Sequence, residues 1–334
     1  MRDTFLYTVR AILPILMLIL LGSVLRRVGP WSQDFYKQLN QLCFRVFLPV
    51  QLFCNVYAIA DLAAMNWYMI GYLFCGILAT MMLGVLMARL LVRDRRQKGV
   101  VVQASFRSNQ AILGLPLANS LGGEAAMGFA SLTTSVTVPL FNFLAVVVLA
   151  LYSSDQDRRP TARDVLRKVL HNPLFMSTML GLAVVIVRQF LPVVDGQPIF
   201  TIRNQLPSVY DTLTRMSGVA SPVMLVVLGT RLDLNAAGAL LPQLSLGVVL
   251  RLIVAPVLLI GVALLFRGPL GITTVEVPSL VTISSTPVAV SSVVMVQELG
   301  GDDQLAGQIV VWTTILSVAT IFCIVYLLRF FGFL

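Results

Sequence analysis

The feature that most constrains this chain is a succession of ten apolar segments, each near the length that crosses a lipid bilayer. A spanning helix needs about 20 mostly apolar residues. Only 12% of the residues are charged, against about 25% in ordinary soluble domains. The sequence therefore predicts an all-α integral membrane protein with ten transmembrane helices, at about 5–25, 39–58, 67–91, 100–121, 129–152, 172–191, 208–228, 241–266, 277–297 and 305–330.

The basic residues lie in short clusters between these segments and predict the orientation. Arg26 and Arg27 follow the first segment instead of preceding it, which favours an outer N-terminus and argues against a cleaved signal peptide. With that start, cytoplasmic loops hold about twice as many Lys and Arg residues as outer loops. We therefore expect a multi-pass cell-membrane protein, in a bacterial inner membrane, with both termini outside. The net charge of +9 belongs to these loops and does not indicate a nucleic-acid partner.

A polar stretch from Ser153 to His171 divides the chain into two halves, which we take as residues 1–155 and 156–334. Pro49 recurs as Pro222 and Pro116 as Pro287, at nearly the same offset (222 − 49 = 173; 287 − 116 = 171). Five spans per half is an odd number, so duplicated halves must run in opposite directions. The pattern predicts two inverted five-helix repeats, a common transporter design.

The fourth and ninth segments are unusually polar, and each contains a proline. A proline inside a helix removes a backbone hydrogen bond and disfavours helical geometry before it. We expect breaks near Pro116 and Pro287, with each proline at the first position of a second half-helix. Gly114 would give the first break its backbone freedom, and Ser285 and Thr286 would cap the second. Two half-helix N-termini meeting at mid-membrane would form an anion site. The alternative is a pair of kinked structural helices.

Several of these runs resemble the auxin efflux carrier family of permeases, which includes plant PIN-type auxin exporters and bacterial permeases assigned to malate or malonate. Asn109 to Leu117 resembles that family's Asn-x-x-x-x-Gly-x-Pro-Leu signature. Further likeness is carried by Asn172-Pro173-Leu174, by Arg251-Leu252 with Pro256, and by Pro287 through Gly301-Asp302.

The resemblance covers nearly the whole chain. It implies ten spans, fourth and ninth helices that cross where they are broken, an elevator or rocking motion, and a homodimer. It also implies that Asn109 helps to hold a substrate carboxylate. Arg45 departs from the family pattern, and the long cytoplasmic loop of many plant members is absent, which argues against auxin as the substrate.

The candidate substrate-binding residues are accordingly Asn109, Gln110, Gly114, Pro116, Ser285, Thr286 and Pro287. We take Arg45, Arg107 and Arg251 as intramembrane cations and assign the other arginines to loops and span ends. A charge within the membrane requires a cavity or a partner. Arg107 would attract an anion or extend to the inner interface. Arg251 would bind unpaired carbonyls near a broken helix or bind an anion. Arg45 is open to either role.

These features predict a secondary transporter of small organic anions, mono- or dicarboxylates, working by alternating access. The alternatives are a sodium-coupled symporter similar to bile-acid transporters and an anion channel. No span has a carboxylate at its middle, which argues against a sodium/proton exchanger. The single histidine and four apolar-segment cysteines predict no catalytic residues, no metal site and no cofactor.

Overall fold

The computed structural model describes residues 2–58, 66–152, 163, 166–167, 170–194, 197–198, 200–231, 238, 240–270 and 272–334. The predicted boundary between the halves, at residue 155, lies outside these residues, as does most of the polar stretch that follows it. The named secondary-structure elements of the described residues are all helices apart from one two-residue antiparallel pair, β1 (Val193–Val194) with β2 (Gln197–Pro198). The prediction of an all-α membrane protein is thus confirmed at the level of fold class.

Helices lie in all ten apolar segments. In the first half they are α1 (Arg2–Val28), α2 (Gln33–Leu42), η1 (Cys43–Phe47), α3 (Leu48–Tyr57), α4 (Trp67–Leu91), α5 (Arg95–Phe106), η2 (Gln110–Gly114) and α6 (Leu115–Tyr152). In the second half they are α8 (Pro173–Gln189), α9 (Ile202–Gln205), α10 (Pro207–Arg231), α11 (Leu241–Val249), η4 (Leu250–Val254), η5 (Val257–Gly261), α12 (Val262–Leu265), α13 (Arg267–Leu270), α14 (Val277–Ser285), α15 (Ser291–Glu298) and α16 (Asp303–Phe330).

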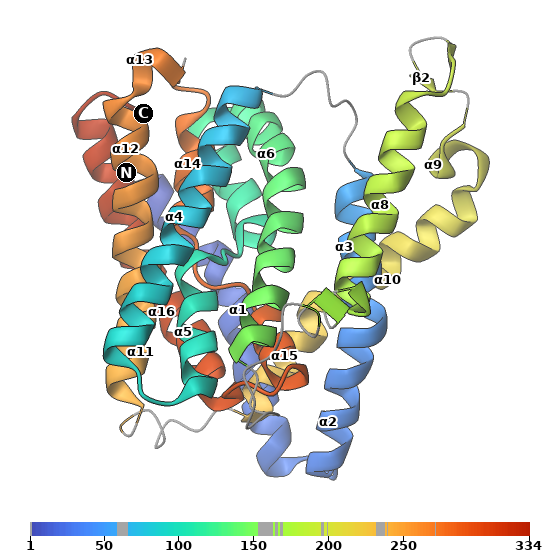
Figure 1. Ribbon diagram of the computed structural model, residues 1–334, viewed down its shortest axis with the longest axis vertical. Helices are drawn as coiled ribbons and strands as arrows, with labels where there is room; N and C mark the ends of the chain where they lie inside the picture. The colour runs from blue at the N-terminus through green and yellow to red at the C-terminus, as the bar shows by residue number, and fades with distance from the viewer. Residues whose placement is uncertain are drawn as a thin grey trace.

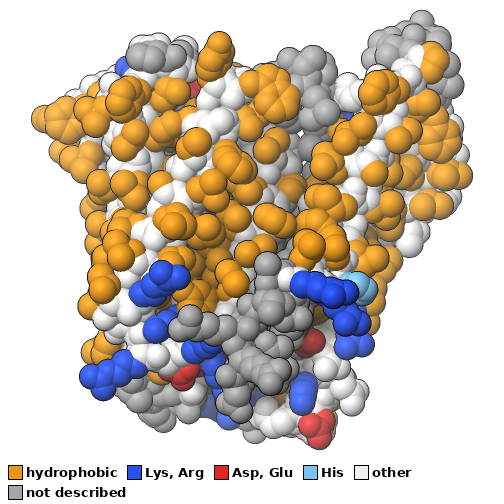
Figure 2. All heavy atoms as spheres, in the orientation of Figure 1, with side chains coloured by type: hydrophobic (Ala, Val, Ile, Leu, Met, Phe, Trp, Pro, Cys, Tyr) orange, Lys and Arg blue, Asp and Glu red, His pale blue; other side chains and the backbone are white. Residues whose placement is uncertain are grey.

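Five helices within the described residues are long and apolar enough to cross a membrane by length and composition, so the protein is a multi-pass membrane protein. They are Trp67–Leu91, Gln110–Tyr152, Pro207–Thr230, Leu241–Leu265 and Asp303–Phe330. Many of their large apolar side chains face outward, as helices in lipid require. Figure 2 shows this apolar belt, with Lys and Arg side chains gathered at the lower end of the visible face.

The continuous helical segment Gln110–Tyr152, made of η2 and α6, has 43 residues and is too long for one membrane crossing. A pair of glycines bends it. Gly122 and Gly123 are non-helical, with Gly123 at φ 69°. Only glycine adopts that left-handed conformation without strain. The bend separates the short segment 115–121 from the long helix that descends to Tyr152, so the fourth and fifth predicted segments are distinct (Figure 1).

Three prolines are accommodated by π-helical turns. The turns η1, η2 and η4 end at Phe47, Gly114 and Val254, and a proline follows each at the second position: Pro49, Pro116 and Pro256. A π turn widens the helix, and such turns often occur where the regular hydrogen bonding of the α-helix is disturbed. Pro116 is therefore built into a continuous helix, and the prediction of a break at that residue is wrong.

The close pairing of α1 with α10 depends on two glycines. A Cβ atom on Gly229 would lie 1.9 Å from the Ile19 carbonyl oxygen, and one on Gly22 would lie 2.0 Å from that of Val226. Ser23 also donates a hydrogen bond to the Gly229 carbonyl at 2.9 Å. A second extensive contact joins α3 to α8, and α3 also packs on α10. Figure 1 shows α3, α8 and α10 to one side of the bundle formed by α4, α5, α6, α11, α14 and α16.

Candidate functional site

The site lies where two helix interruptions meet. The first interruption covers Arg107–Asn109, between α5 and η2, and the second covers Thr286–Val290, between α14 and α15. Ser108 pairs with Val288 in an isolated antiparallel bridge, and the Asn109 N–H donates to the Pro287 carbonyl at 2.8 Å. The hydroxyls of Ser108 and Thr286 lie 3.2 Å apart. One backbone hydrogen bond, from Asn109 to Pro287, therefore joins the two interruptions.

The first interruption lies seven residues before the predicted position, Pro116. The second includes Pro287, and Thr286 before it has the extended geometry (φ −68°, ψ 151°) that a following proline favours. However, α15 begins at Ser291, and its N-cap Val290 makes no side-chain capping bond. The expectations that each proline opens its half-helix, and that Ser285 and Thr286 cap the second one, are therefore wrong.

Arg251 holds the ends of the two preceding half-helices together. Its guanidinium donates to the carbonyls of Thr286 at 2.9 Å (Nε), Phe106 at 3.2 Å (Nη1) and Ile283 at 2.6 Å (Nη2). Its side chain is fully buried. Among the alternatives for Arg251, these contacts match the binding of unpaired carbonyls beside an interrupted helix.

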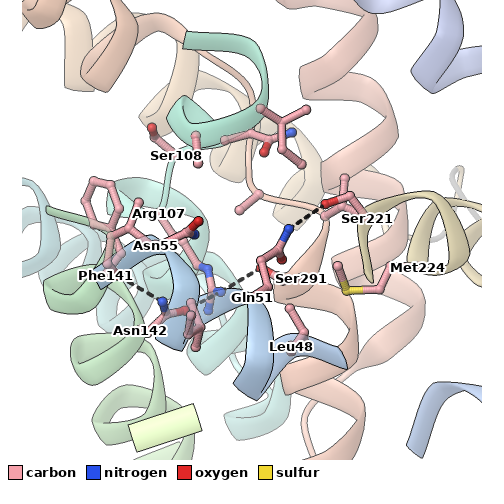
Figure 3. Close-up of a pocket in the computed structure, with 17 residues that line it drawn as sticks. Leu48, Gln51, Asn55, Arg107, Ser108, Phe141, Asn142, Ser221, Met224 and Ser291 are labelled. Atoms are coloured by element: carbon pink, nitrogen blue, oxygen red, sulfur yellow. Dashed lines mark hydrogen bonds between the residues drawn. The ribbon is translucent and has the colours of Figure 1, made fainter. Parts of the chain in front are cut away.

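A cavity of about 120 Å³ lies beside the interruptions (Figure 3). It is lined from both interruptions and from α3, α6 and α10. The polar lining residues are Gln51, Asn55, Arg107, Ser108, Asn109, Asn142, Ser221 and Ser291, and the apolar ones are Leu48, Leu52, Ala111, Ile112, Val138, Phe141, Met224, Ala289 and Val290. Among the residues that the structure describes, no Asp or Glu lines this cavity.

Arg107 contributes the cavity's one positive charge among its described lining residues, and its side chain is only 3% exposed. Its Nη2 donates to the Asn142 Oδ1 and to the Ser291 Oγ, each at 2.7 Å. Its Nη1 contacts the Met295 sulfur. Figure 3 shows Arg107, Asn142 and Ser291 converging from three elements. All of these partners are neutral, so they orient the guanidinium without cancelling its charge.

Three amide side chains line the cavity as well. Gln51 Nε2 on α3 donates to the Ser221 hydroxyl on α10 at 3.2 Å, as drawn in Figure 3. The side chains of Asn55 and Asn109 form no hydrogen bond with any residue that the structure describes, although Asn109 is only 5% exposed. Their amides are free to bind a ligand in the cavity.

The other predicted site residues lie outside the cavity lining. All but Arg45 are close to the place where the two interruptions meet, which we call the crossing. Gln110 is fully buried and donates to the Thr137 hydroxyl. Gly114 provides close packing, because a Cβ atom there would lie 2.9 Å from that of Thr282. Arg45 is exposed in η1 and does not line the cavity. The structure thus brings Asn109 and Arg107 together at the cavity, with Pro116, Ser285, Thr286 and Pro287 beyond its lining.

Sequence reasoning missed Gln51, Asn55, Asn142, Ser221 and Ser291. A signal was present for most of them, because they are polar residues close to prolines in apolar segments. Gln51 and Asn55 are four residues apart just after Pro49, Ser221 precedes Pro222, and Asn142 follows Pro139 by three residues. Polar residues at such positions within a span are candidates for a cavity wall.

Interrupted apolar helices beside a buried cavity with polar groups are typical of membrane transport proteins. A family model described as membrane transport protein matches residues 7–325, and the chain belongs to that family, which is of the auxin efflux carrier type. The chain is also similar to an uncharacterized transporter of Methanothermobacter thermautotrophicus, with 23% identity over 323 residues that cover 95% of this chain and 97% of that protein. The resemblance noted from the sequence is confirmed.

Proposed function

We propose that this protein is a secondary transporter of small organic anions, mono- or dicarboxylates, which it binds in the cavity beside Arg107 and Asn109. The observation that carries the proposal is the buried Arg107 guanidinium, whose hydrogen-bond partners are neutral. A charged group buried within a membrane protein is strongly unfavourable unless it is paired. A substrate carboxylate would supply the missing countercharge.

The helices that follow the two interruptions, η2 and α15, add to the positive electrostatic field in the cavity. The cavity is lined by Asn109, Ala111 and Ile112 at the start of η2, and by Val290 and Ser291 at the start of α15. Helix N-termini carry partial positive charge and bind anions through their backbone N–H groups. Arg107, these two ends and the amides of Asn55 and Asn109 are a set of donors suited to an anion.

The cavity's size favours a small substrate. Its volume of about 120 Å³ is well below the roughly 300–1,000 Å³ of pockets for drug-sized ligands. An anion of a few carbon atoms suits this volume better than a bulky aromatic acid. The mixed lining, with Leu52, Val138 and Phe141 among the polar groups, suits a short hydrocarbon backbone between polar ends.

We further propose that the chain crosses the membrane ten times, as two inverted repeats spanning residues 1–155 and 156–334. The pairing of the helices supports this, because α1 with α10 and α3 with α8 exchange places when the two halves are interchanged. One interruption per half also supports it. Alternating access would then arise from motion between the helices that carry the crossing and the rest of the protein.

The proposed orientation places both termini on the outer side of the cell membrane. The start of α1 and the end of the chain lie in the upper half of Figure 1, away from the α4–α5 turn with Arg93 and from Arg95 and Arg96 at the start of α5. The basic side chains at the lower end of Figure 2 would then face the cytoplasm, as the positive-inside rule favours. A homodimer is proposed from the family resemblance alone.

The proposal is tested by measuring the melting temperature of the purified protein with acetate, lactate, malonate, malate and succinate. Malonamide is the matched control, because it keeps the shape of malonate without the charge. Stabilisation by at least one carboxylate and not by malonamide is expected, since a ligand that binds only the folded state raises its stability. Equal responses to malonate and malonamide, with no carboxylate effective, would contradict an anion site. In proteoliposomes, saturable uptake with counterflow would distinguish a carrier from a channel.

A further inference from the structure

The C-terminal ends of two half-helices meet at the crossing. Helix α5 ends at Phe106 and α14 at Ser285, so their last carbonyls have no partner within their own helix. Such ends carry partial negative charge, and in transporters with interrupted helices they commonly coordinate the coupling sodium ion. The question for this protein is which group occupies that position.

Arg251 occupies it. Its three hydrogen bonds go to Phe106 at the end of α5, to Ile283 in the last turn of α14, and to Thr286 directly after it. The side chain has no exposed surface, and all three acceptors are backbone carbonyls. The guanidinium thus lies where a coordinated cation would lie, and it contacts both half-helices at once.

The charges at this position balance. Each helix C-terminus is equivalent to roughly half a negative elementary charge, so two ends offset about one positive charge. Arg251 therefore has its countercharge in the two helix ends. Arg107 has no such countercharge, because its guanidinium contacts only neutral side chains, including Ser291 at the N-terminal end of α15. Of the two arginines at the crossing, the charge of Arg251 is offset by helix ends and the charge of Arg107 is not.

We propose that Arg251 is a tethered substitute for a coupling ion: it fills the cation position between the two half-helix C-termini, so that sodium is not required there. It is a positioning residue, because it keeps the crossing assembled without contacting the substrate. Transport of the anion would then not depend on sodium, and this consequence alone rests on the proposed function.

One other group of oxygens at the crossing competes with this inference. The Gln110 Oε1 atom is buried without a hydrogen-bond partner in the described structure, and the hydroxyls of Thr137, Thr133 and Ser279 lie nearby in a connected set of hydrogen bonds. Oxygen atoms of this kind are the ligands that hard cations prefer. Sodium bound there would make the protein sodium-dependent despite Arg251, so the experiment must detect it.

The experiment measures the melting temperature of the full-length protein without any organic anion, in sodium chloride and in choline chloride at equal ionic strength. For the wild type we expect the same value in both salts. The Arg251→Ala variant should melt at a lower temperature, and low concentrations of guanidinium chloride should restore most of the loss by filling the vacated position. Arg45→Ala is the matched control, because Arg45 is exposed and outside the cavity lining.

Two results would overturn the proposal. One is a wild-type melting temperature clearly higher in sodium than in choline. The other is an Arg251→Ala variant that gains no more from guanidinium than Arg45→Ala does. If Arg251→Ala does not fold, the wild-type salt comparison and Arg251→Lys decide, since lysine keeps the charge but lacks the planar fork. Arg251→Lys is expected to stay sodium-independent, and sodium-dependent melting would overturn the proposal. A failed anion screen would contradict the transport proposal without altering these results.

Discussion

The backbone N–H of Asn109 donates a 2.8 Å hydrogen bond to the carbonyl of Pro287, a residue 178 positions later in the chain (287 − 109 = 178). This bond fixes the Asn109 backbone against the opposite interruption. Its side chain is left to line the cavity, where it bonds to no other described residue. The two functions of Asn109 can therefore be separated by substitution, because only the side chain is replaced.

Replacing Asn109 by Ala should weaken anion binding while the protein remains folded. The loss of one hydrogen bond to a charged group is worth about 1.5–3 kcal/mol, or roughly 10- to 100-fold in affinity. Asn109→Asp should weaken binding further, because it places a negative charge against the substrate. Affinity for the best carboxylate and melting temperature are measured on the same preparations, with exposed Asn119→Ala as the control. Unchanged affinity in well-folded Asn109→Asp would contradict the assignment.

Replacing Arg107 by Gln should reduce anion affinity more strongly than any neutral change in the cavity. Truncating one member of a buried charge pair costs about 2–5 kcal/mol. Arg107→Lys should retain part of the affinity, because lysine keeps the charge but not the two-pronged contact with Asn142 and Ser291. Titration with the same carboxylate measures both. If Arg107→Gln bound as tightly as the exposed control Arg45→Gln, the anion would have to bind elsewhere.

The α1–α10 contact predicts opposite effects for two glycines of one helix. Gly229→Ala should destabilise the protein by about 1–3 kcal/mol, the usual range for overpacking, because its Cβ would meet the Ile19 carbonyl at 1.9 Å. Gly218→Ala has no atom within 4 Å of its new Cβ and should stabilise α10 by about 0.5–1 kcal/mol. Thermal unfolding of both variants tests the packing, and equal melting temperatures would refute it.

The orientation predicts which loops face the cytoplasm. A reporter active only in the cytoplasm should work when fused at Asp155 and fail when fused after Leu334, and a reporter active only outside should do the reverse. The Lys and Arg distribution is the reason for this expectation. Cytoplasmic activity at both positions would require a different number of crossings, and an inverted result would reverse the membrane orientation.

The family resemblance predicts a homodimer. The protein's mass in detergent, determined by light scattering with the detergent contribution subtracted, should correspond to two chains of 36.5 kDa. The contact is expected among the helices outside the crossing. A single-chain mass at every protein concentration would remove this expectation.

The helices and their polar interruptions could be predicted from the sequence, but the position of the first interruption could not. Apolar runs of bilayer length determine helices because lipid leaves no other partner for the backbone. Pro116 was a misleading signal, because the helix continues through it after the π turn Gln110–Gly114. The interruption lies instead where Ser108 pairs with Val288, a contact between halves that no local pattern encodes.

The cavity was predicted only in part for the same reason. Asn109 and Arg107 stood out as polar residues in an apolar segment, whereas Ser221 and Gln51 share the site because α3 packs on α10. Which faces of two distant helices meet depends on close approaches such as that of Gly22 and Gly229. Those approaches are properties of the assembled bundle.

The π turns before Pro49, Pro116 and Pro256 have a geometrical consequence for anyone drawing these helices in projection. Each π turn acts like one inserted residue, and one residue corresponds to roughly 100° of rotation in an α-helix. A helical-wheel projection that treats Cys43–Tyr57 as a regular α-helix would therefore place Gln51 and Asn55 about a quarter turn away from the cavity wall that they form. Deleting one residue within η1 should swing both amides out of the cavity while leaving the span's length and hydropathy almost unchanged.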